Sequence, residues 1–200
     1  FRIGDESVHD VVRPATAGAG VRCIGCHGST PDGEYVGFSA SPVPDNGDPT
    51  AMALRSSDGL GSEPPFLTAA ARTLMARQNQ EQPAFSHAHW QAGDRIAITM
   101  WPVNDRFEIM WTDLEASSTA QGTGWGLLAR TGDTREAGYA SFFHATDDLL
   151  YVSGADMASG MTTTSGDLAR VPYGNRAGGA ASFVAGASSA SWNEYYPTAS

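Results

Sequence analysis

The sequence predicts an all-β protein built from repeated antiparallel sheets. Runs of strand-forming residues recur along the 200 residues, and turns rich in Gly, Asp and Pro separate them. Helix-like composition is confined to 68–78, which could equally be a loop with one helical turn. A strand–turn–strand phrase also returns at long intervals, so the repeating unit holds several short strands. Together these observations favour the blades of a β-propeller, each an antiparallel four-stranded sheet.

The first copy of the phrase spans 29–38, where a Pro-Asp-Gly turn precedes strand-forming Tyr, Val and Phe residues. Further copies cover 85–98 and 139–152, and a fourth begins at 193 and is cut off at 200. The turns lie near residues 32, 93 and 147, at intervals of 61 and 54 residues. Such intervals are close to those of propeller blades.

This spacing divides the chain into two regions. Residues 1–22 are an N-terminal segment and a candidate part of a preceding blade, and residues 23–200 hold the blades. A closed propeller needs at least four blades. Three copies and a truncated fourth therefore predict an incomplete propeller, and we expect this chain to be one piece of a longer polypeptide.

Shorter segments complete the predicted blades. The additional strand candidates are 106–112, 125–130, 167–173 and 181–184. Segments rich in Gly, Ser and Asp are expected to form loops, and these are 41–63, 116–124 and 155–166.

The only two cysteines, Cys23 and Cys26, are three positions apart and are followed at once by His27. This C-x-x-C-H spacing is typical of a c-type haem, in which each thiol bonds one porphyrin vinyl group and the histidine binds the iron. We therefore predict one covalent haem c, held by thioethers to Cys23 and Cys26, with His27 as the proximal iron ligand. Gly25 and Gly28 are expected to let the backbone pass close to the macrocycle.

Other chemistries fit the cysteine pair less well. A thioredoxin-like redox pair is followed by a helix, whereas a Thr-Pro-Asp-Gly turn follows here. A structural zinc site needs four ligands, and the chain has no second cysteine pair, although His87 and His89 could contribute. A disulfide across two residues is strained. Zinc and redox chemistry remain as alternatives to haem.

The repeated phrases resemble the WD40-like repeats of the TolB type, whose blades carry a Tyr-Pro-x-Trp/Phe-Ser-Pro-Asp-Gly-Lys hairpin. The segment 23–38 is similar to a bacterial subgroup with C-x-x-C-H directly ahead of that turn. The resemblance covers about 20–200, with Thr30 in place of the serine and further departures at 92–94 and 146–148. It implies that the phrase forms the innermost strand of each blade, so the haem would lie near the rim of the central channel.

The repeat alignment also suggests a distal iron ligand. It sets Cys26 opposite His87 in the second copy and opposite Ser141 in the third. His87 and His89 alternate along the predicted inner strand, so either could point toward the iron, and His87 is the distal candidate.

Two further residue types are candidates for contact with the haem. Met75 and Met100 are alternative distal ligands, because methionine is also an axial ligand in c-type cytochromes. Arg22, beside the motif, is a candidate partner for a haem propionate.

One haem without a second catalytic motif predicts electron transfer. The sequence contains no G-x-S-x-G, H-E-x-x-H or phosphate-loop pattern. The leading hypothesis is a monohaem c-type cytochrome on a propeller scaffold, more consistent with an electron carrier than with a catalyst. Two alternatives stay open. One is a binding or assembly module with a structural or sensory haem, and the other is a haem-containing oxidoreductase whose second centre lies outside this chain.

Charge and hydropathy restrict the partners and the location. The net charge of −10 argues against nucleic acid or an anionic membrane surface. No apolar run reaches the roughly 18–20 residues of a membrane span. The expected partners are redox proteins, such as other cytochromes or a membrane electron-transfer complex. Because haem is attached to this motif beyond the cytoplasmic membrane, we expect a bacterial periplasmic or extracellular protein.

Overall fold

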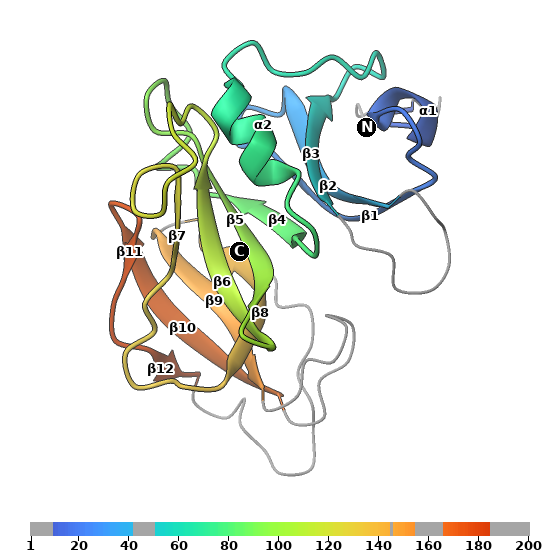
Figure 1. Cartoon of the computed structure of the whole chain (residues 1–200). Helices are drawn as coiled ribbons and strands as arrows, with labels where there is room; N and C mark the ends of the chain where they lie inside the picture. Colours follow the sequence, from blue (N-terminus) through green and yellow to red (C-terminus); the bar gives the residue numbers. More distant parts are fainter. Residues whose placement is uncertain (1–9, 42–50, 145, 155–165, 185–200) are drawn as a thin grey trace, which may run out of the picture.

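Three antiparallel sheets follow one another along the chain and lie side by side in the computed structural model (Figure 1). The structure describes residues 10–41, 51–144, 146–154 and 166–184. Within these ranges there are only two short helices, α1 (Pro14–Ala17) and α2 (Ala69–Met75). The predicted all-β class with antiparallel sheets is therefore confirmed.

Each sheet contains one copy of the repeated phrase. The first sheet has the order β1 (Cys23–Ser29), β2 (Tyr35–Ser41) and β3 (Ala51–Ser56). The second has the order β4 (Glu81–Phe85), β5 (Ile96–Val103), β6 (Arg106–Asp113) and β7 (Trp125–Leu127). The third contains β8 (Glu136–Phe142), β9 (Asp148–Gly154) and β10 (Gly166–Gly174), and β10 also pairs with β11 (Ala177–Gly178) and β12 (Ser182–Phe183).

The first strands of the sheets lie against one another. β1 contacts β4, and β4 contacts β8, so these three strands form a shared centre from which the sheets extend. This is the arrangement of propeller blades around a common axis, with β1, β4 and β8 as the innermost strands. It is an incomplete propeller in the described part of the chain.

Each innermost strand is interrupted at the same point by a β-bulge. The strand registers shift between Gly25 and His27, between Glu81 and Ala84, and between Gly138 and Ser141. The residues in these bulges are Cys26, Gln82 and Tyr139, with φ angles of 41°, 56° and 56°. Such angles are uncommon for residues other than glycine, so their recurrence marks a structural repeat.

The bulges correct the repeat alignment made from the sequence. The structural equivalents of Cys26 are Gln82 and Tyr139, at intervals of 56 and 57 residues, and not His87 and Ser141. The alignment was wrong because it was anchored on the turns. The connection from β4 to β5 has ten residues, whereas those from β1 to β2 and from β8 to β9 have five each, and the inner strands keep a nearly constant period.

The turn between β1 and β2 forms as predicted, with threonine in the serine position. Gly33 has a φ of +72°, and its amide donates to the Thr30 carbonyl at 2.9 Å. The Thr30 hydroxyl accepts from the Tyr35 amide at 3.1 Å and donates to the Asp32 carboxylate at 2.5 Å. A hydroxyl at this position closes the turn, and threonine supplies it as serine would.

The structure contains a strand and a helix in two segments, 41–63 and 68–78, where the sequence predicted a loop or left a helix uncertain. Residues 41–63 were expected to form a loop, but β3 lies inside that range because Met52 and Leu54, at 4% and 0% exposure, alternate toward the core. Helix α2 falls within 68–78 and begins where the Thr68 hydroxyl accepts from the Ala71 amide at 3.0 Å. The fourth copy of the phrase, from 193, lies outside the described residues.

Candidate haem site

Strand β1 carries the complete C-x-x-C-H motif. Cys23 is exposed, Cys26 is half-buried, and neither forms a disulfide. His27 is exposed and pairs in register with Phe38 of β2. In a regular strand, residues three apart point to opposite faces. The bulge at Cys26 breaks that alternation, so Cys23 and Cys26 do not follow the spacing of an ordinary strand.

The Cys26 thiol is kept protonated by its surroundings. Burial raises the pKa of Cys26, and the nearby charge of Glu81 raises it further. Redox-active cysteine pairs have the reverse character, with a lowered thiol pKa. The raised pKa of Cys26 is therefore unlike that of a thioredoxin-like pair.

A pocket of about 480 Å³ opens beside the motif, between the innermost strands. β1 contributes Cys26 and His27 to its wall, β4 contributes Gln82, and β8 contributes Tyr139. All three bulge residues thus line this pocket. Its volume lies within the range of about 300–1,000 Å³ that is usual for small-molecule and cofactor sites.

Two histidines from the other blades also line this pocket. His87 lies two residues beyond the end of β4, and His144 lies two residues beyond the end of β8. Both are exposed, and their ring centroids are 5.0 Å apart. The sequence had placed His87 and His89 on an inner strand, which is wrong because β4 ends at Phe85.

His89 is hydrogen-bonded to two carboxylates and does not line the pocket. Its Nδ1 lies 2.5 Å from Asp94 Oδ2, and its Nε2 lies 2.7 Å from Asp147 Oδ2. Asp147 also accepts from the Ser86 hydroxyl, whose oxygen receives the His89 amide at 3.3 Å. Because both ring nitrogens face carboxylates, His89 joins the second blade to the third.

The two glycines of the motif differ in their surroundings. A Cβ atom at Gly25 would meet nothing within 4 Å, so open space adjoins the backbone between the two cysteines. A Cβ atom at Gly28 would lie 2.6 Å from the Pro83 carbonyl oxygen. The expectation for Gly25 is compatible with this space, but Gly28 is small because β1 packs directly against β4.

This difference predicts unequal effects of the same substitution. Gly28→Ala should lower the free energy of unfolding by about 1–3 kcal/mol, because β1 or β4 must shift to relieve the overlap. Gly25→Ala, two residues after Cys23, should leave stability nearly unchanged. Urea denaturation followed by tryptophan fluorescence compares the two variants, and equal midpoints would contradict the close approach of β1 to Pro83.

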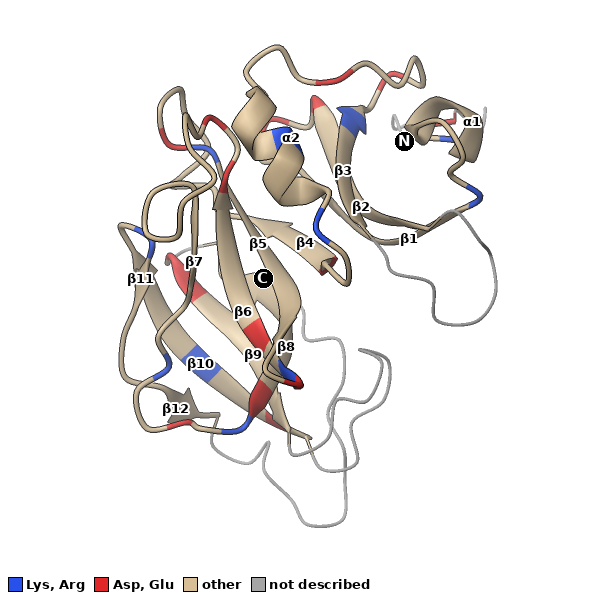
Figure 2. Cartoon of the chain, in the orientation of Figure 1, with Lys and Arg blue, Asp and Glu red and all other residues tan. Residues whose placement is uncertain are grey.

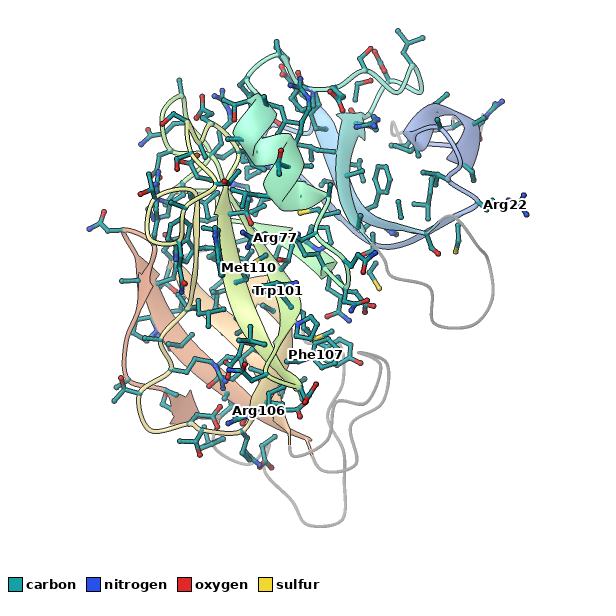
Figure 3. The ribbon with its side chains drawn as sticks, viewed as in Figure 1. Arg22, Arg77, Trp101, Arg106, Phe107 and Met110 are labelled. Atoms are coloured by element: carbon teal, nitrogen blue, oxygen red, sulfur yellow. The ribbon has the colours of Figure 1, made fainter. Side chains whose placement is uncertain are left out.

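The remaining sequence candidates lie apart from the pocket. Met75 and Met100 are 3% and 2% exposed and pack in hydrophobic cores, and neither is among the residues that line the pocket. Arg22 is exposed and projects away from the sheets at the start of β1 (Figure 3). Arginines are scattered along the described elements, interspersed with acidic residues (Figure 2).

The sequence leaves His144 open as a distal ligand, together with His9, Met52, Met110, Met157 and Met161, and a stronger signal for His144 was present. The pattern Phe-x-His occurs at 85–87 and again at 142–144, and each copy ends an innermost strand. Alignment on strand ends instead of turn residues would have paired His144 with His87. Among the described residues, no three His, Cys, Asp or Glu side chains converge as a metal site.

The residues present therefore fit a covalent haem. Two free thiols and a histidine occur in the required order on one strand, and open space adjoins Gly25 between the thiols. A cofactor-sized pocket with two further imidazoles is lined by Cys26 and His27, while Cys23 lies outside its lining.

Comparison with known proteins gives one structural neighbour. No family model matches the chain, and no curated protein matches it. A solved structure, TolB from Acinetobacter baumannii, is 16% identical with a TM-score of 0.47. The match covers 78% of this chain and 31% of TolB, so the chain spans about a third of that protein. Neither described helix has the length and apolar character of a membrane span.

Proposed function

We propose that this chain is a monohaem c-type cytochrome domain that transfers electrons, with the haem carried on the innermost strand of its first blade. The observation that supports this most directly is the position of the motif. Cys26 and His27 border the pocket between the blades, and His87 and His144 border the same pocket from the neighbouring blades.

The residues of β1 would hold the cofactor. Cys23 and Cys26 would form the two thioethers, and His27 would bind the iron as the proximal ligand. The bound haem supplies a centre that gains or loses one electron. Pro83, Phe85 and Phe142 are buried residues of the pocket wall, and they would exclude water from part of the ring. Such shielding is one way in which a protein sets the haem potential.

Electron transfer requires no open coordination position on the iron. His87 is retained as the distal candidate from the sequence, and its exposed ring lines the pocket. A haem with two imidazole ligands exchanges electrons without binding a substrate. Its partner would be another redox protein, such as a cytochrome or a membrane electron-transfer complex, and attachment of the haem would take place in the periplasm or outside the cell.

Two measurements test this function. The purified protein should retain its haem through denaturing electrophoresis, and its pyridine haemochrome should have the band position of haem c. The native oxidised protein should then be six-coordinate and low-spin, and the reduced protein should not bind CO. A high-spin protein that binds CO would instead favour a sensory haem or a catalyst, and loss of the haem to acidified organic solvent would contradict the proposal.

A further inference from the structure

His87 and His144 form a pair that belongs to the pocket and not to the framework of the blades. Each follows its innermost strand by two residues, so they occupy equivalent positions in the second and third blades. The rings are 5.0 Å apart between centroids and tilted by 49°. Apart from this ring contact, the structure records no hydrogen bond or ion pair for either imidazole among the described residues.

The distance between the two rings shows whether they could occupy opposite or neighbouring positions on one metal ion. Two imidazoles on opposite sides of one metal ion have ring centres about 6 Å apart, whereas two on neighbouring positions are about 4.5–5 Å apart, given metal–nitrogen distances of about 2.0–2.1 Å. At 5.0 Å, His87 and His144 lie side by side. They are therefore not arranged as the two opposite axial ligands of one haem iron.

We propose that His87 and His144 are alternative distal ligands of the same haem, so that either imidazole can complete the coordination of the iron opposite His27. This inference rests on the proposed haem function and extends it to a residue of the third blade. The remaining described candidates do not compete for this position. Both nitrogens of His89 face carboxylates, and Met75 and Met100 are buried in hydrophobic cores.

The test compares the haem protein with three variants, His87→Ala, His144→Ala and the double variant, by absorption spectroscopy and CO binding. Both single variants should stay six-coordinate and low-spin, because the remaining imidazole takes the distal position. The double variant should become high-spin and should bind CO when reduced. His89→Ala is the matched control, and it should retain the low-spin spectrum.

Each contrary result has a distinct meaning. A high-spin spectrum in either single variant would overturn the proposal of two alternative ligands, because it would identify the replaced histidine as the sole distal ligand. A low-spin double variant would overturn it as well, since neither histidine would then bind the iron. Absence of covalent haem from the unsubstituted protein would contradict the proposed function itself. The pyridine haemochrome detects that failure before any variant is made.

Discussion

Replacement of both motif cysteines by alanine is expected to abolish covalent attachment of the haem completely. Cys23 and Cys26 each supply one thioether, and the sequence contains no other cysteine. Cys23→Ala and Cys26→Ala should each keep one thioether, with the haemochrome band shifted toward that of a haem with one unreacted vinyl group. Haem staining after denaturing electrophoresis, together with the haemochrome spectrum, measures both effects.

The matched control for this experiment is His27→Ala. The imidazole binds iron but forms no bond to the porphyrin, so this variant should retain covalent haem wherever the protein accumulates, with an altered spectrum. Covalent haem in the double cysteine variant would refute attachment through the motif. If one single variant lost all its haem while the other lost none, the haem would be held by one motif cysteine alone, and the assignment of two thioethers would be wrong.

A second large effect is expected at Asp133, far from the motif in sequence. Asp133 Oδ2 accepts from Arg130 Nη1 at 2.7 Å and from the Tyr151 hydroxyl at 2.8 Å. The side chains of Arg130 and Asp133 are 3% and 1% exposed. Asp133→Ala leaves Arg130 paired with Glu108 at 2.6 Å but removes the acceptor of Arg130 Nη1 and of the Tyr151 hydroxyl, so the free energy of unfolding should fall by about 1–3 kcal/mol.

The same carboxylate predicts a dependence of stability on pH. Burial opposes the ionised form, but hydrogen bonds from the Tyr151 hydroxyl and the Arg135 amide, together with the charge of Arg130, lower the pKa of Asp133 below its usual 3.8. A carboxylate with a lowered pKa stabilises the fold above its unfolded-state pKa and loses that contribution as pH falls through the folded value. This part of the stability should therefore disappear below about pH 4.

Urea denaturation at pH 7 and at pH 3 measures both effects. Asp133→Asn should lose stability at pH 7 and should show a smaller decrease between the two values than the unsubstituted protein does. The control is Asp10→Ala, which removes an exposed ion pair with Arg13 and should leave the midpoint unchanged. An Asp133→Ala protein as stable as the control would contradict the structural role of this carboxylate.

The fold could be predicted from the sequence because its signals are local. The Pro-Asp-Gly turn, the alternation in 106–112 and the strand composition of 167–173 each determine a short element, and β6 and β10 cover those last two segments. β3 was missed because its short apolar run, which contains Met52 and Leu54, lies within a segment rich in turn-forming residues.

The candidate site was predictable only in part, for a physical reason. Cys23, Cys26 and His27 are adjacent in sequence, so their spacing alone carries the chemistry. The partners across the pocket come from other blades, and their positions depend on where β4 and β8 end. β4 ends at Phe85, so His87 and His89 follow the strand and do not belong to it. The Ser86 hydroxyl accepts a hydrogen bond from the His89 amide, and His89 takes a different place from His87. The spacing of the two histidines in the sequence does not reveal that hydrogen bond.

The most direct test of the central claim is the intact mass of the denatured chain, measured without prior exposure to reductant. We expect the mass of the polypeptide plus one haem, with the added mass confined to the peptide that contains Cys23 and Cys26 after proteolysis. The mass of the unmodified polypeptide, from protein produced with a functioning cytochrome c maturation system, would contradict the haem assignment.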